Sequence, residues 1–264
     1  MNSMRIDDLN LVPFQHFNLC VPPHSFIMIA GSNRSGKTQL IKILGGLIPT
    51  DTTVVFHKAY LESYATQEVY QKIHVFLGND KWHFIFKTVE EELRFPLENL
   101  GFSTNEINKK LTDIMTIFSL DKVMRLDPNH LNKYLKVKVL LALQLISEPE
   151  VLLLDDPTKM LTKQQRQEIL ALLNYYQMKG MTIIMTTSTL DDALTAKASK
   201  LYILHKGKIV LEGAIYDVLK EDSLLSKVGL RLPFMVDLSV KLKYYNLIDD
   251  IVLDPESLVN QLWK

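Results

Sequence analysis

The stretch of sequence that decides the fold is Gly31-Ser32-Asn33-Arg34-Ser35-Gly36-Lys37-Thr38, which matches the pattern G-x-x-x-x-G-K-[ST] at every fixed position. An apolar run over residues 26–30 precedes it and predicts a buried strand of a parallel sheet. A helix is expected over residues 38–44. Glycines let the backbone wrap closely around phosphate groups, and the N–H groups of the loop and of the helix N-terminus point at the anion. The sequence therefore predicts that residues 31–38 bind the phosphates of a nucleotide.

Side chains near this loop predict a magnesium site. Lys37 supplies positive charge to the β- and γ-phosphates, and the Thr38 hydroxyl is a ligand for Mg²⁺. A second buried strand is expected over residues 151–154, and Asp155, which follows it, is expected to hold Mg²⁺ directly or through water. The alternatives are a glycine turn that matches by chance and an Asp that only caps a turn. Because the loop lies between a strand and a helix, a nucleotide and Mg²⁺ are the expected ligands.

The composition excludes several classes of protein. The chain has 264 residues, with 30 Lys and Arg against 30 Asp and Glu, so general electrostatic binding to nucleic acid is not expected. A single cysteine, Cys20, excludes an intrachain disulfide framework and a Cys-rich zinc site, and the reducing cytosol is the simplest compartment. The uncharged stretch over residues 9–33 is broken by prolines and polar residues, so no membrane-spanning helix is expected there. A membrane role would therefore need a partner.

The order of the remaining segments predicts an α/β fold. Ser103 and Glu106 have the spacing of a capping box, and a helix with apolar residues at helical period follows. Helical segments fill the chain from about residue 88 to residue 147, and strands then alternate with helices. The other expected elements are strands over residues 53–56, 73–77 and 182–186, a hairpin over 201–204 and 208–211, and helices over 131–147, 162–178, 233–245 and 254–263.

The motifs together carry a family resemblance. Asp155-Asp156-Pro157-Thr158 follows the second buried strand, far along the chain from Lys37 and beyond a helical segment. This arrangement resembles the ATP-binding subunit of an ABC transporter over nearly the whole chain. Residues 88–95 are similar to the helix that follows the family's Q-loop. The tail, Gly229-Leu230-Arg231-Leu232-Pro233-Phe234 with the closing residues 256–263, looks like the C-terminal extension of ATPase subunits in energy-coupling factor (ECF) transporters.

The resemblance implies a domain organisation. It implies an α/β P-loop NTPase core of the ABC ATPase type with an inserted helical subdomain and a small C-terminal α extension. The ABC-type nucleotide-binding domain would occupy residues 1–222, with the helical subdomain at about 88–147. The C-terminal extension would occupy residues 223–264.

The segment expected to carry the family's L-S-G-G-Q signature departs from it. The sequence there is Leu131-Asn132-Lys133-Tyr134-Leu135. In the family this segment closes on the γ-phosphate bound by the opposite subunit, and it needs glycines for close approach and a Ser hydroxyl. Lys133 and Tyr134 replace both glycines, so their bulk is expected to obstruct that approach.

Other positions that the resemblance assigns to catalysis and binding are also substituted. Asp156 replaces the Glu that polarises the attacking water, and it is one methylene shorter; a displacement of about 1 Å can cost roughly a hundredfold in rate. Ser188 replaces the switch His that contacts the γ-phosphate, and Leu77 replaces the Q-loop Gln. Thr162 stands where the D-loop has Asp, and Phe14 is a weak candidate for the aromatic that stacks on adenine.

The resemblance implies an ATP-binding subunit of an ECF-type importer of a vitamin or a metal ion, with weak or absent ATP hydrolysis. The expected partners are a second ATPase subunit, in a homo- or heterodimer, and a transmembrane coupling subunit. The expected location is cytoplasmic, peripheral on the inner face of the cell membrane. The alternative is a non-catalytic regulatory or structural subunit that ATP stabilises in an assembly. A P-loop kinase or GTPase is disfavoured, because the chain has no Asn-Lys-x-Asp motif.

Two further segments, an aromatic run and a group of lysines, can each be interpreted in two ways. The aromatic-rich run Lys81-Trp82-His83-Phe84-Ile85-Phe86 is either the floor of a groove for a membrane partner or ordinary core. The basic residues Lys133, Lys136 and Lys138 are expected on a solvated helix face, or facing the nucleotide of a dimer partner. The histidines are scattered, so no metal cluster is expected.

Overall fold

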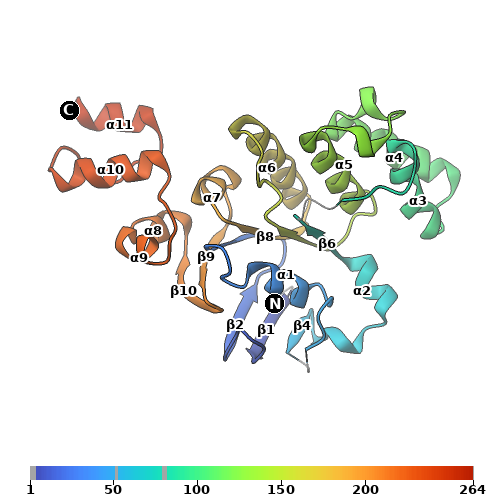
Figure 1. Cartoon of the computed structure of the whole chain (residues 1–264), viewed down its shortest axis with the longest axis horizontal. Helices are drawn as coiled ribbons and strands as arrows, with labels where there is room; N and C mark the ends of the chain where they lie inside the picture. The colour runs from blue at the N-terminus through green and yellow to red at the C-terminus, as the bar shows by residue number, and fades with distance from the viewer. Residues whose placement is uncertain (1–3, 51–52, 79–81, 264) are drawn as a thin grey trace.

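The computed structural model describes residues 4–50, 53–78 and 82–263. Their strands form a four-stranded antiparallel sheet in the order β2-β1-β4-β5 and a six-stranded sheet in the order β10-β9-β3-β8-β7-β6 (Figure 1). The strands are β1 (Met4–Leu9), β2 (Phe17–Val21), β3 (Phe26–Ala30), β4 (Val54–Phe56), β5 (Ala59–Tyr60), β6 (Ile73–Leu77), β7 (Val151–Asp155), β8 (Thr182–Thr187), β9 (Lys200–His205) and β10 (Lys208–Gly213).

Helices cover the six-stranded sheet. α1 packs against β7, α5 packs against β6, and α6 packs against β8. The α-helices are α1 (Lys37–Leu44), α2 (Thr66–Lys72), α3 (Val89–Asn99), α4 (Thr104–Phe118), α5 (Lys133–Leu145), α6 (Lys163–Met178), α7 (Leu190–Ala196), α8 (Ile215–Leu219), α9 (Asp222–Lys227), α10 (Phe234–Tyr244) and α11 (Pro255–Leu262). Short 3₁₀ turns occur at Leu61–Ser63, Asp121–Val123 and Pro128–His130.

The centre of the six-stranded sheet explains the continuous apolar run over residues 26–30. β3 pairs in parallel with both β8 and β9, and β7 pairs in parallel with β8 and β6. Phe26 and Met28 belong to a core shared with the helices α3 to α6, whereas Ile27 and Ile29 belong to a core shared with α1 and the antiparallel sheet. Both faces are therefore buried, which requires apolar residues at every position of the strand.

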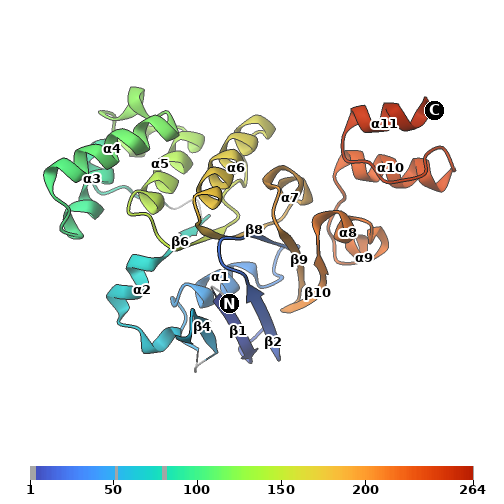
Figure 2. The same ribbon diagram turned by 180° about the vertical axis from the view of Figure 1, so that it is seen from behind.

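The inserted helices form a lobe at one end of the molecule. Figures 1 and 2 show α3, α4 and α5 grouped beyond β6, at the end opposite α10 and α11. Thr88 and Ser103 begin α3 and α4 with complete capping boxes, so the capping-box prediction at Ser103 is confirmed. The fold is the expected α/β P-loop core with an inserted helical subdomain.

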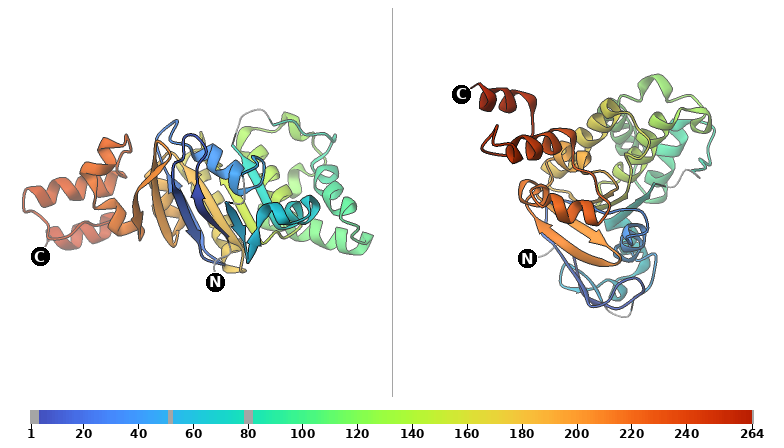
Figure 3. Two further views of the ribbon diagram at one scale, coloured as in Figure 1. Left: turned by 90° about the horizontal axis from the view of Figure 1, so that it is seen from below. Right: turned by 60° about the vertical axis from the view of Figure 1, so that its left-hand side comes forward.

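The C-terminal helices project from the β10 edge of the sheet, as both views in Figure 3 show. They have a small core of their own, made by Ile248, Val252 and Leu258 with Leu238 and Leu242 packed against it. The expected helix near residue 233 begins one position later, because Pro233 is extended and precedes the first helical residue. The C-terminal segment is therefore the expected small α extension.

Among the described residues, no helix is both long enough and apolar enough to cross a membrane. The same residues contain no group of three or more His, Cys, Asp or Glu side chains that is placed to hold a metal ion.

The aromatic run contributes to the core in part. Lys81 lies outside the described residues. Trp82 packs on Phe76 with ring centroids 5.8 Å apart, and its Nε1 donates to the Leu77 carbonyl at 3.1 Å. Phe84 is buried, while Ile85 is 81% exposed.

Candidate phosphate-binding site

The phosphate loop follows β3 at the carboxyl end of the parallel strands, where ligands of open α/β sheets bind. Its two glycines are sterically required. A Cβ on Gly31 would lie 2.5 Å from the Leu204 carbonyl oxygen and 2.6 Å from Ser35 Oγ. Gly36 has φ of +109°, and a Cβ there would lie 3.1 Å from the ring of Phe14. The loop can therefore keep its close path only with glycine at both positions.

Lys37 is the buried cation of the loop. Its Nζ donates to the carbonyls of Gly31 at 2.6 Å and Ser32 at 3.0 Å, and the residue is only 8% exposed. Burial lowers the pKa of Lys37, while the charges of Asp156 and Asp155 act in the opposite direction. When a phosphate binds in the loop, the Lys37 ammonium group would donate its hydrogen bonds to the phosphate oxygens instead of to these carbonyls.

Thr38 and Asp155 meet across the loop. Thr38 Oγ1 donates to Asp155 Oδ2 at 2.7 Å, and Thr186 Oγ1 donates to Asp155 Oδ1 at 2.7 Å. β6 and β7 are in register at this edge, so Leu77 lies beside Asp155. A hydroxyl and a carboxylate oxygen at hydrogen-bond distance are the hard oxygen ligands that Mg²⁺ prefers.

The surrounding cavity fits a magnesium nucleotide in size and chemistry. Its volume is about 440 Å³, and it is lined by Pro13, residues 33–39, Gly78, Asp155, Asp156 and Lys159. The first N–H groups of α1 have no acceptor within the helix, so they are available to an anion. Thr38 and Asp155 would hold the metal, and residues 31–38 would hold the phosphates.

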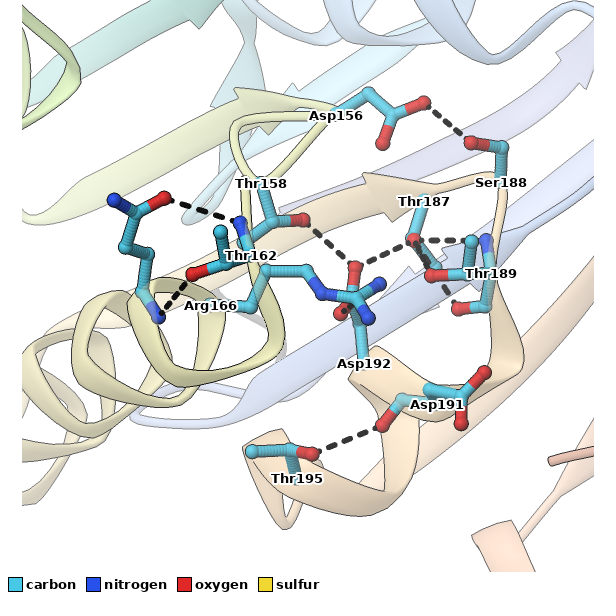
Figure 4. Close-up of polar contacts among 11 residues, drawn as sticks. Asp156, Thr158, Thr162, Arg166, Thr187, Ser188, Thr189, Asp191, Asp192 and Thr195 are labelled. Carbon is cyan, nitrogen blue, oxygen red and sulfur yellow. Dashed lines mark hydrogen bonds and ion pairs between the residues drawn. The ribbon is translucent and has the colours of Figure 1, made fainter. Parts of the chain in front are cut away.

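Asp156 and Ser188 are bonded to each other at the edge of this cavity (Figure 4). Ser188 Oγ donates to Asp156 Oδ2 at 2.9 Å. Asp156 adopts a left-handed backbone with φ of +48°, and its N–H bonds to the Thr186 carbonyl at 3.1 Å. Burial raises the pKa of Asp156, and the hydrogen bond from Ser188 acts in the opposite direction.

Comparison with known proteins identifies the family. The family described as ABC transporter matches residues 14–159, which is more than half of the chain. The chain is 30% identical over 261 residues to the energy-coupling factor transporter ATP-binding protein EcfA1 of Halalkalibacterium halodurans, covering 97% of this chain and 93% of that protein. The chain is an ATP-binding protein of the ABC transporter family, of the ECF type.

Further relatives agree with this assignment. EcfA2 of Clostridium perfringens is 29% identical over 267 residues, covering 94% of this chain and 93% of that protein. The solved structure of cbiO1 from Clostridium perfringens, described as part of the ABC transporter complex cbiONQ, superposes with a TM-score of 0.76 at 22% identity. It covers 86% of this chain and 94% of that chain, and it shows the shared fold.

Several positions named from the resemblance take structural roles in this ECF-type protein. Phe14 is 1% exposed and packs edge-on against Phe17, so its ring is not available to stack on adenine. Thr162 begins α6 with a complete capping box. Leu77 is partly buried against the core that α1 shares with the antiparallel sheet.

The segment that the resemblance assigns to the signature begins a helix. Asn132 caps α5, and its side chain accepts from the Leu135 N–H at 3.0 Å. The interpretation of the basic strip as a solvated face was wrong for Lys138. This residue is 3% exposed, its Nζ donates to Glu168 at 2.9 Å, and it lies 5.3 Å from the centre of the Tyr134 ring. Helical periodicity turns Lys138 toward α6, where the carboxylate compensates its charge.

A buried network behind Asp156 was not predicted from the sequence (Figure 4). Asp192, 3% exposed, accepts from Thr158 Oγ1 at 2.7 Å and from Thr187 Oγ1 at 3.1 Å, and Arg166 Nη1 lies 3.6 Å away. The network joins the loop after β7, the end of β8 and α6. The available signal was an Asp among the apolar positions of the short helix α7.

Proposed function

We propose that this chain binds MgATP in its own phosphate loop and transmits binding, with weak or absent hydrolysis, to the other subunits of an ECF-type importer. The observation that carries the proposal is the phosphate-binding site: both required glycines, a buried Lys37, and Thr38 2.7 Å from Asp155. Residues 31–38 would bind the phosphates, and the bound metal would neutralise their charge. The chain's relatives are named as energy-coupling factor ATP-binding proteins, which supports the transport role.

Weak hydrolysis follows from the groups that would face the terminal phosphate. Asp156 would have to orient the attacking water. Its carboxylate already accepts a hydrogen bond from the Ser188 hydroxyl, and its side chain is shorter than that of Glu. The Ser188 hydroxyl proton is thus already donated to Asp156, and the side chain of Leu77 has no polar atom. Lys133 and Tyr134 add bulk where a partner's nucleotide would approach. These substitutions support impaired turnover both in this chain's site and in the partner's site.

The proposed partners are a second ATPase subunit and a transmembrane coupling subunit, with the chain peripheral on the inner face of the membrane. An apolar groove of about 450 Å³ supports contact with the membrane subunit; its lining includes Leu47, Tyr70, Phe95 and Leu143. Tyr70 is 55% and Phe95 42% exposed, which is suited to a buried interface. We assign residues 1–222 to the nucleotide-binding domain and 223–264 to the extension, and we propose a vitamin or metal ion as cargo.

The test separates binding from turnover. Isothermal titration with MgATP should show saturable binding by the wild-type chain and none by Lys37→Ala. A steady-state phosphate-release assay, with and without a co-purified membrane subunit, should show little turnover. Hydrolysis at ordinary ABC rates by the chain alone would contradict the impaired site, and wild-type protein without ATP affinity would refute the proposal.

A second candidate function is a non-catalytic regulatory subunit, favoured by the Ser188–Asp156 bond. The two functions differ in what ATP does to the assembly. In the transport function, ATP changes uptake of the cargo into vesicles that contain the membrane subunits. In the regulatory function, ATP only changes the amount of assembled complex.

A further inference from the structure

Lys159 brings a cation into the cavity that the motif G-x-x-x-x-G-K-[ST] does not contain. It lies in the loop between β7 and α6, where its N–H donates to the Asp156 carbonyl at 3.2 Å. Its exposed side chain lines the cavity together with Gly78, Asp155 and Asp156, while residues 33–39 line it from the phosphate loop. Within the part of the chain that the structure describes, no carboxylate forms an ion pair with Lys159.

The loop that carries Lys159 is anchored on both sides. Before it, Thr158 is 1% exposed and its hydroxyl donates to the buried carboxylate of Asp192 at 2.7 Å (Figure 4). After it, Leu161 is buried, and its N–H donates to the Thr158 carbonyl at 3.1 Å. The backbone of Lys159 is therefore fixed beside the cavity, while its long side chain stays free to reach a ligand.

The charges in the cavity leave a role for this side chain. Burial lowers the pKa of Lys37, the positive charge of Lys159 adds to that lowering, and the carboxylates of Asp156 and Asp155 oppose it. Lys37 and Lys159 line the same cavity, so an anion held there can lie between them. Of the residues that line this wall of the cavity, Gly78, Asp155, Asp156 and Lys159, only Lys159 is a cation that can bind a phosphate.

We propose that Lys159 binds the terminal phosphate of a nucleotide held in this chain's own loop and makes the site prefer ATP to ADP. The inference rests on the proposed ATP binding. The loop N–H groups hold the inner phosphates and Lys37 reaches the β- and γ-phosphates, so a cation on the opposite wall meets the outermost phosphate. Because Lys159 is solvent-exposed, its contribution is modest and weakens with added salt.

The experiment measures ATP and ADP affinities by titration of the full chain with Mg²⁺ present. Lys159→Met should raise the dissociation constant for ATP about fivefold and that for ADP less than about twofold, as expected for one exposed ionic contact. Lys159→Arg should keep the preference for ATP. Lys163→Ala is the matched control, because Lys163 is an exposed lysine at the start of α6 outside the cavity lining.

The outcomes separate the two proposals. If wild type binds neither nucleotide, the proposed ATP binding itself fails. If Lys37→Ala abolishes binding while Lys159→Met matches Lys163→Ala for both nucleotides, the role of Lys159 is refuted and ATP binding stands. An equal loss for ATP and ADP would overturn the assignment to the terminal phosphate. A thermal melt of each variant shows whether it is folded.

Discussion

The phosphate loop, residues 31–38, and the segment at the start of α5, residues 131–135, are under different physical constraints. In the loop, Gly31 and Gly36 sit where a Cβ would collide with a carbonyl or an aromatic ring, and Lys37 is buried among backbone acceptors. The second segment contains no glycine, and its side chains cap and pack α5. The first segment is therefore shaped for the close approach of an anion, whereas the second is shaped for capping and packing a helix.

The same contrast holds between the neighbouring carboxylates of the site. Asp155 accepts hydroxyl hydrogen bonds from Thr186 and from Thr38, the other residue expected to hold the metal. Asp156 accepts from Ser188, the residue that the family resemblance places at the switch position. Each carboxylate thus accepts a hydroxyl: Asp155 from Thr38, with which it would share the metal, and Asp156 from Ser188 at the edge of the cavity.

The largest expected effect comes from adding one methyl group to the loop. Gly31→Ala should abolish ATP binding and lower the free energy of unfolding by about 3 kcal/mol, because the new Cβ would overlap the Leu204 carbonyl and Ser35. Urea unfolding and ATP titration measure the two effects. Gly101→Ala is the control: Gly101 has φ of +78° but nothing within 4 Å of its Cβ position, so only the backbone cost of about 1 kcal/mol remains.

A result in which Gly31→Ala binds ATP like wild type would break the comparison, because the loop would then tolerate side chains as freely as residues 131–135 do. Equal destabilisation by Gly31→Ala and Gly101→Ala would show that the loop relaxes around the new Cβ, because Gly31 does not share the positive φ of Gly101.

A smaller effect is expected where α5 packs on α6. Glu168→Ala should destabilise the protein by about 1–2 kcal/mol, because it leaves the buried ammonium of Lys138 without its 2.9 Å partner. Lys138→Met should change stability by less than about 0.5 kcal/mol, since Glu168 is half exposed and water can solvate it. Urea unfolding of both variants provides the measurement. An equal loss from both would mean that the ion pair itself, and not burial of Lys138, dominates.

Sequence reasoning identified the parts of the site that are contiguous along the chain. The loop, the apolar strand before it and Asp155 after the second strand follow from local spacing, and parallel pairing brings their ends to one edge of the sheet. The helix starts at Ser103 and Thr162 were also predictable, because a capping box involves residues only three positions apart.

The rest depends on contacts between distant segments. Lys138 reads as a surface residue until α6 supplies Glu168, and Asp192 reads as a helix-start carboxylate until Thr158 and Arg166 meet it. Phe14 could not be assigned from spacing, because its burial depends on packing against Phe17. Periodicity predicts which face of an element is apolar, but it does not predict which polar side chain on another element will compensate a buried charge.

The smallest expected effect concerns the pH dependence of Asp156. Burial raises the pKa of this carboxyl in the folded protein, so folding favours its protonated form. The unfolded chain ionises at the lower, ordinary pKa, and stability is therefore lost as pH rises from that value through the raised one. Asp156→Asn removes this loss and keeps an oxygen acceptor for Ser188. Its melting temperature should exceed that of wild type at pH 7, and the difference should shrink toward about pH 4.

Ser188→Ala tests the contribution of the other residue of this pair to the pKa of Asp156. Removing the hydroxyl takes away a hydrogen bond to the ionised form of Asp156, so the pKa of Asp156 rises further. This variant should therefore match wild type more closely at low pH and fall below it at neutral pH, the reverse of Asp156→Asn. Identical pH profiles for the three proteins would show that Asp156 is solvated like a surface carboxylate. It would then be free to turn toward a nucleotide, and the contrast between the two carboxylates would be lost.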